Sequence, residues 1–111
     1  MRSVNPSYRQ ERRGLALMLA ASSLAALTGC GSTLYSLRAN AASGKLEEAR
    51  ELGAEQSAAY EYFYAKEHLQ KAQTEAAEAD YSDAVDLAEA SEEYADKALR
   101  IAREARSGAP K

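Results

Sequence analysis

The stretch from Asp80 to Arg106, "DYSDAVDLAEASEEYADKALRIAREAR", decides the fold of this chain. Alanines and larger apolar residues recur in it at alternating steps of three and four, the spacing of one face of an α-helix. Asp80 or Ser82 can cap the start of such a helix, and the arginines near its end complement the helix dipole. We therefore expect one helix from about Ser82 to Arg106, packed through Ala84, Leu87, Ser91, Tyr94, Ala98, Ile101 and Ala105, with Ala88, Ala95 and Ala102 beside them.

Two more stripes with helical spacing precede this one. The nearer stripe consists of Tyr62, Ala65, Leu69, Ala72, Ala76 and Ala79. The earlier stripe consists of Leu46, Ala49, Gly53, Gln56, Tyr60 and Phe63, and Leu34, Leu37 and Ala41 extend it toward the amino terminus. No run alternates with the period of a strand. The sequence predicts an all-α fold over residues 34–107, an elongated up-down-up bundle of about three helices with a thin, alanine-rich core.

The breaks between these helices are less certain than the helices themselves. Ser43 and Gly44 mark one possible interruption, and "EADYSD" (residues 78–83) marks a clearer one. The sequence leaves open whether the first two helices are continuous through residues 57–59.

The amino-terminal segment, up to "LALMLAASSLAALTGCGS" (residues 15–32), has a different character. Its apolar run from Leu15 to Leu27 is shorter than the roughly 20 residues that a helix needs to cross a bilayer. Arginines dominate the residues before it, and small residues follow it. This order is typical of a cleaved secretory signal peptide, which we assign to residues 1–29.

The end of that segment resembles the lipobox of bacterial lipoproteins. Leu27, Thr28 and Gly29 precede Cys30, the only cysteine in the chain. The resemblance implies cleavage before Cys30, diacylglycerol on its sulfur and an acyl group on the new amino terminus. Two or three acyl chains anchor a protein stably. We expect residues 30–33 to form a short tether to membrane lipid and residues 108–111 to form a flexible tail.

The charge of the remaining chain argues against nucleic acid as a partner. Residues 1–29 hold four of the 14 basic residues and one of the 17 acidic ones, which leaves ten against sixteen, a formal charge near −6. Phosphate binding needs a basic face. The segment from Ala72 to Asp96 instead carries nine acids and no base. Such a run is usually a solvated helix face, with metal chelation or repulsion from anionic lipid as the alternatives.

The residues offer little chemistry for an enzyme. His68 is the only histidine, and its position predicts a partly exposed residue at the flank of a packing face. One imidazole with scattered glutamates is a poor metal site and cannot complete a catalytic triad. We therefore expect no enzymatic activity, no metal site and no cofactor other than the covalent lipid on Cys30.

An aromatic cluster is the remaining candidate for binding. Tyr60, Tyr62, Phe63 and Tyr64 lie within five residues, and consecutive helical positions point about 100° apart. They cannot all face one core. We expect Tyr62 to pack inward and Tyr60 or Tyr64 to meet a partner or a glycan, since tyrosine is enriched at interfaces. The alternative is a core in which the first helix covers Tyr60 and Phe63.

The segment "GAEQSAAYEYFYAKEHLQKAQTEAAEADYSDAVDLAEASEEYADKAL" (residues 53–99) resembles a known family. This family is the alanine-rich helical domain of unknown function 4398, found in small envelope lipoproteins of delta-proteobacteria. The family tends to have a proline where this chain has Ser57, Ala58 and Ala59. Within the same segment, "ADYSDAVDLAEAS" is similar to the second helix of a tetratricopeptide repeat, without that repeat's tryptophan and glycine.

This resemblance implies a place in the cell envelope and no established reaction. It also implies another envelope protein as partner, such as an outer-membrane-protein-A-like peptidoglycan-binding protein. Gly31 and Ser32, rather than aspartate, follow Cys30, which favours the outer membrane, facing the periplasm. Two readings stand: a non-enzymatic helical adaptor or assembly factor, and a small ligand- or peptidoglycan-binding module.

Overall fold

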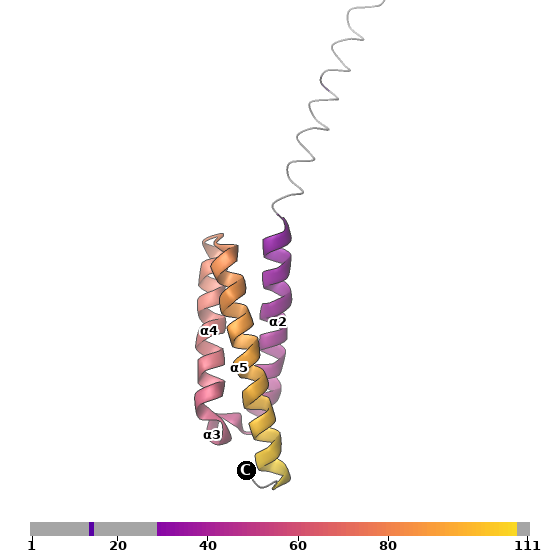
Figure 1. Ribbon diagram of the computed structural model, residues 1–111, viewed down its shortest axis with the longest axis vertical. Helices are drawn as coiled ribbons and strands as arrows, with labels where there is room; N and C mark the ends of the chain where they lie inside the picture. The colour runs from indigo at the N-terminus through magenta and orange to yellow at the C-terminus, as the bar shows by residue number, and fades with distance from the viewer. Residues whose placement is uncertain (1–13, 15–28, 109–111) are drawn as a thin grey trace, which may run out of the picture. The chain divides into compact units, whose positions relative to one another are not determined.

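The computed structural model describes residue 14 and residues 29–108, and within them the chain is helical (Figure 1). The helices are α2 (Gly29–Glu51), α3 (Ala54–Ser57), α4 (Ala59–Ala77) and α5 (Tyr81–Ser107). No strand occurs in this part of the chain, so the predicted all-α helical bundle is confirmed. The contacts divide the chain into two units, Met1–Cys30 and Gly31–Lys111, and the helical bundle belongs to the second.

The predicted signal peptide, residues 1–29, lies outside the described residues except for Gly14 and Gly29, and so do residues 109–111. Residues 30–33, expected as a short tether, belong to α2. Among the described residues no helix is both long enough and apolar enough to cross a membrane.

The three long helices lie side by side in an up-down-up arrangement (Figure 1). Helices α4 and α5 are antiparallel, because Ser91 contacts Ala65 whereas the later Tyr94 contacts the earlier Tyr60. Helices α2 and α5 run parallel, because their side-chain partners keep a nearly constant separation of 47 to 55 residues along both helices. The short α3 turns the chain between α2 and α4.

Alanine dominates the core between these helices. The hydroxyl of Ser91, completely buried in α5, donates a 2.6 Å hydrogen bond to the carbonyl of Ala65 in α4. Such small residues let two helix backbones approach closely, but each of them removes little apolar area from water. The predicted thin core is therefore present: its larger members are Leu46, Tyr62, Leu69 and Leu99, and the others are Ala39, Ala42, Ala49, Ala54, Ala58, Ala65, Ala72, Ala88, Ala95, Ala98 and Ala102.

The extension of the first stripe through Leu34, Leu37 and Ala41 is wrong. Leu34 is 41% exposed and Leu37 is 65% exposed. The step from Ala41 to Leu46 spans five residues, which turns the stripe away from one helix face. The buried face of α2 keeps steps of three and four and consists of Ala39, Ala42, Leu46 and Ala49. At the other end of the chain, Ala105 is also exposed, one turn after the last buried residue of α5.

The first interruption falls at Gly53 rather than at Ser43 and Gly44, which α2 passes through without a break. Gly53 has a φ of 82°, a left-handed conformation that favours glycine. Ala58, with φ −141° and ψ 46°, separates α3 from α4. The first two long helices are therefore not continuous through residues 57–59.

The second turn lies where the acidic "EADYSD" segment predicts it. The carboxylate of Asp80 accepts a 3.3 Å hydrogen bond from the backbone N–H of Asp83, which confirms Asp80 as the N-cap. Helix α5 begins at Tyr81, one residue before the predicted start. Ala79, just before the cap, has a φ of 63°. It is the one residue other than glycine with a positive φ among the described residues.

We expect Ala79→Gly to raise the free energy of unfolding by up to about 1 kcal/mol. The left-handed conformation costs an alanine roughly 1–2 kcal/mol, of which the extra chain entropy of glycine offsets a part. Urea titration followed by circular dichroism measures the change. Ala90→Gly, inside α5, is the matched control and should lower the same free energy by about 1 kcal/mol. A loss of stability in both variants would contradict a strained turn at Ala79.

Candidate functional site

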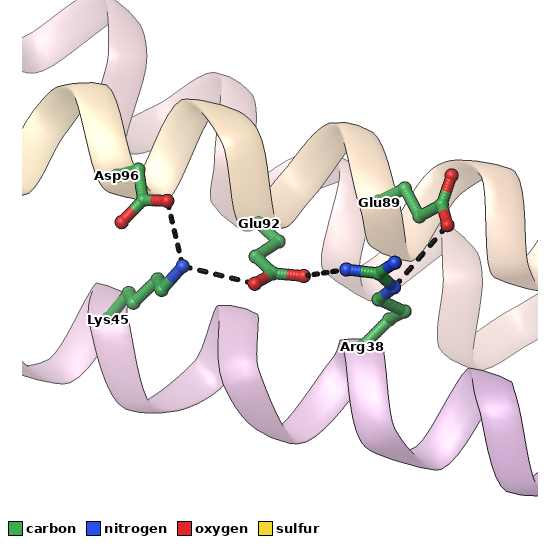
Figure 2. Close-up of polar contacts among 5 residues, drawn as sticks. All are labelled: Arg38, Lys45, Glu89, Glu92 and Asp96. Atoms are coloured by element: carbon green, nitrogen blue, oxygen red, sulfur yellow. Dashed lines mark hydrogen bonds and ion pairs between the residues drawn. The ribbon is translucent and has the colours of Figure 1, made fainter.

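The acidic run does not form one uniform solvated face, because three of its acids face α2. Lys45 Nζ lies 2.7 Å from Asp96 Oδ2 and 3.0 Å from Glu92 Oε1. Arg38 Nη1 lies 3.1 Å from Glu92 Oε2, and Arg38 Nε lies 3.3 Å from Glu89 Oε1 without making a hydrogen bond. Figure 2 shows the resulting ladder, in which acids of α5 alternate with cations of α2. We call these five residues the charge ladder.

Glu92 is the central member of the charge ladder and its most enclosed carboxylate. Its side chain is 19% exposed, whereas the side chains of Glu89 and Asp96 are about half exposed. The hydrogen bond from Lys45 holds the pKa of Glu92 below its ordinary value, and Arg38 contributes in the same direction against the effect of burial. The pKa of Lys45 is raised, chiefly by its hydrogen bond to Asp96.

Two further contacts continue the connection between α2 and α5 toward their carboxyl ends. Arg103 forms an ion pair with Glu48. Arg106 Nη1 donates to the backbone carbonyl of Glu51 at 3.5 Å. Part of the acidic run and of the basic end of α5 therefore tie α2 to α5, and these groups are not free to bind a partner.

A second group of acids gathers at the turn between α4 and α5. One carboxylate oxygen from each of Glu75, Asp80 and Asp83 lies within 4.8 Å of the others. Asp80 already serves as the N-cap, and acids in the first turn of a helix complement its dipole. Helix capping and the helix dipole account for Asp80 and Asp83, whereas Glu75 lies in the last turn of α4. We assign the cluster no ligand.

The tyrosines divide between core and surface. Tyr62 is 4% exposed and points into the core, and burial raises its pKa, with a smaller contribution from Glu55. Tyr60 is 65% exposed and Phe63 is 45% exposed. The alternative in which the first helix covers Tyr60 and Phe63 is therefore wrong. These two residues point away from the buried stripe of α4, while α2 lies against α5.

Tyr60, Tyr64 and Tyr94 form a cluster that joins α4 to α5, in which Tyr60 is exposed and the other two are half-buried. The ring centroids of Tyr64 and Tyr94 are 4.0 Å apart, and the edge of Tyr60 meets Tyr94 at 6.2 Å and 73°. Lys97 Nζ lies 4.2 Å from the centroid of the Tyr94 ring. His68 stacks on Tyr64 at 3.9 Å and 18°, and its Nδ1 lies 2.9 Å from the Tyr64 carbonyl oxygen. The cluster is preorganised by these contacts between rings.

Helix α4 carries an open groove beside this cluster, lined by Ala59, Tyr60, Phe63, Tyr64 and Glu67. We call it the aromatic groove. It offers apolar ring surfaces and one carboxylate, Glu67, that can accept hydrogen bonds. Such a surface suits the binding of a peptide or a sugar ring.

The prediction that Tyr60 reaches the surface is confirmed, whereas Tyr64 is half-buried, and His68 is half-buried as expected. Tyr94 packs against the core as its place in the stripe of α5 predicts, but its contacts with Tyr60 and Tyr64 were not predicted, and Glu67 was considered only as a poor metal ligand. The signal that could have found Tyr94 is the antiparallel pairing of the two alanine stripes, because it brings position 94 opposite positions 60 and 64.

Cys30, the residue predicted to carry lipid, is the second residue of α2. Its thiol is free and the residue is exposed. Gly29 begins the helix, and the other lipobox residues, Leu27 and Thr28, lie outside the described residues.

None of the family models, curated proteins or solved structures with which the chain was compared matches it.

We expect Glu92→Gln to lower the free energy of unfolding by about 1 kcal/mol at neutral pH, because it weakens two ion pairs between α2 and α5. Glu93→Gln is the matched control and should have a smaller effect, since Glu93 pairs with Lys97 inside α5 and joins no other helix. Urea titrations of the three proteins measure both effects. Equal losses in the two variants would contradict a special role for the charge ladder.

The effect of Glu92→Gln should also depend on pH. The pKa of Glu92 is lower in the folded protein than its ordinary value of 4.5. Its contribution is therefore complete above pH 4.5 and is lost as the pH falls through the lower folded pKa. The difference in unfolding free energy between wild type and Glu92→Gln should shrink below pH 4.5. A constant difference from pH 7 to pH 3 would contradict this.

Proposed function

We propose that this chain is a non-enzymatic, lipid-anchored protein of the cell envelope that acts as a helical adaptor or assembly factor. The observation that carries the proposal is the distribution of side-chain size, with small side chains buried and large aromatic ones exposed. The core is mostly alanine, whereas large aromatic residues, Tyr60 and Phe63, lie on the surface. Exposed aromatic residues that are already ordered by their neighbours are typical of binding surfaces.

The contacts that restrain the rings of the aromatic cluster support a role in binding. The ring of Tyr64 packs between the rings of Tyr94 and His68, and the ring of Tyr60 contacts those of Tyr64 and Tyr94. These rings lose little side-chain entropy when a partner covers them, because their neighbours already restrain them. The partner in this proposal is another envelope protein, such as an outer-membrane-protein-A-like peptidoglycan-binding protein.

The sequence before Cys30 supports the anchor. An arginine-rich start, a short apolar run and a lipobox-like end precede a cysteine whose thiol is exposed. The proposed location is the outer membrane, facing the periplasm, with the inner membrane as the alternative.

A specific observation favours a second candidate, peptidoglycan binding. Glu67 lines the aromatic groove together with Tyr60, Phe63 and Tyr64. Aromatic faces pack on the apolar faces of sugar rings, and a carboxylate accepts hydrogen bonds from sugar hydroxyls. In this candidate the same groove holds a glycan in place of a protein segment.

We expect the intact mass of the membrane-extracted protein to correspond to a chain that begins at residue 30 and carries diacylglycerol or three acyl chains. Cys30→Ser should lack this species, because serine offers no thiol for the thioether. Mass spectrometry of both proteins makes the comparison. A wild-type chain that retains residues 1–29 without a lipid increment would overturn the proposed anchor.

A photo-crosslinking amino acid at position 60 should capture an envelope protein, and the same group at Gln70 should not. Gln70 is exposed on the same helix, about 15 Å further along it. Phe63→Ala, which alters the groove beside the crosslinker, should reduce the captured protein about tenfold if Phe63 is an anchor of the contact.

Sedimentation with isolated peptidoglycan separates the two candidates. Loss of sedimentation in Glu67→Gln, with helix content retained by circular dichroism, would replace the adaptor by the glycan-binding candidate. Equal capture from positions 60 and 70 would overturn the role of the groove.

A further inference from the structure

Helix α2 carries an apolar surface that the core does not use. Leu34 and Leu37, 41% and 65% exposed, lie on this helix three residues apart, and Ala41 follows at the next turn. This spacing places the three side chains along one helix face. Neither leucine belongs to the hydrophobic core cluster of the bundle.

The charge ladder prevents α2 from turning these leucines inward. The buried face of α2 is already occupied by Ala39, Ala42 and Leu46, and Arg38 and Lys45 are paired with acids of α5 (Figure 2). Rotation that buried Leu37 would expose the alanine face and break the ion pairs. The exposed leucines are therefore a fixed property of this bundle.

The covalent distance to Cys30 indicates what covers the leucines. Leu34 is four residues and Leu37 is seven residues after Cys30 in the sequence. Even a fully extended chain spans at most about 14 Å and 25 Å over these distances. A lipid on Cys30 consequently keeps both leucines close to the bilayer surface.

The residues from Gly31 to Leu37 are compatible with contact with the bilayer surface. No charged residue occurs from Gly31 to Leu37, and the first charge, Arg38, is engaged with Glu89 and Glu92. Contact with lipid in this region would therefore remove no unpaired charge from water. Apolar side chains of a helix that rests on a bilayer lie about 5–10 Å deep, at the boundary between headgroups and acyl chains.

We propose that Leu34 and Leu37 form a membrane-contact face, and that the protein rests on the bilayer through the first turns of α2 as well as through its lipid. The inference depends on the proposed lipidation of Cys30. It adds that contact with the membrane gives the bundle one orientation relative to the bilayer, whereas the lipid alone would let the bundle rotate freely.

The test uses the mature lipid-modified protein in phosphatidylcholine vesicles. Leu37→Cys and, as the matched control, Ser36→Cys are each labelled with an environment-sensitive fluorophore, because Ser36 lies at nearly the same height on α2 but is rotated about 100° away from Leu37. Both positions are exposed on α2, and the lipid blocks the native thiol. The label at position 37 should be quenched by spin-labelled acyl chains at least about twofold more than the label at position 36, and iodide in the water should quench it less.

Three outcomes are distinguished. Intact mass is measured first, and an unmodified Cys30 would contradict the proposed anchor independently of the fluorescence measurement. A modified Cys30 with equal lipid quenching at positions 37 and 36 is consistent with the anchor and overturns the membrane-contact face. Shielding of position 37 from iodide without quenching from the lipid shows that protein covers the leucines, which also overturns it.

Discussion

The close approach of α4 and α5 is the constraint on which the rest of the structure depends. It requires small side chains along the whole contact, and the hydrogen bond from Ser91 to the Ala65 carbonyl shows how near the two backbones come. A bulky residue at Ala65, Ala88 or Ala95 would separate the helices, since all three are completely buried. The antiparallel pairing then determines which residues of the two helices face each other, including Tyr64 and Tyr94.

Two consequences follow from a core made of alanine. Each buried alanine removes little apolar area from water, so the third helix gains limited stabilisation from packing alone. The charge ladder adds to the contact between α2 and α5, and it also selects one rotation of α2. Apart from Tyr62, which belongs to the core, the aromatic side chains lie at the edge of the alanine contact, where Tyr64 stacks on His68 and packs against Tyr94.

The sequence was sufficient for those features that depend on neighbouring residues. Most buried positions of α4 and α5 follow from helical spacing, although Ala79 and Ala105 of the predicted stripes are exposed, and the Asp80 cap follows from the residue type. The register of α2 did not, because a five-residue step from Ala41 to Leu46 separates two faces that only the structure distinguishes. The charge ladder could not be predicted from the sequence for another reason. Its partners are about 50 residues apart, and their pairing depends on the rotation and direction of two helices together.

The bundle thus presents different chemistry on different helices. On α4 the aromatic groove combines ring faces with the Glu67 carboxylate, whereas on α2 the surface offers two leucines without a nearby free charge. A surface of rings and a carboxylate matches a polar, shaped partner, while a purely apolar pair of leucines matches lipid. The charge ladder couples the two, since it fixes the rotation of α2 relative to α5, and Tyr94 of α5 belongs to the aromatic cluster. A membrane that orients α2 therefore also orients the surface through which the adaptor would hold its partner.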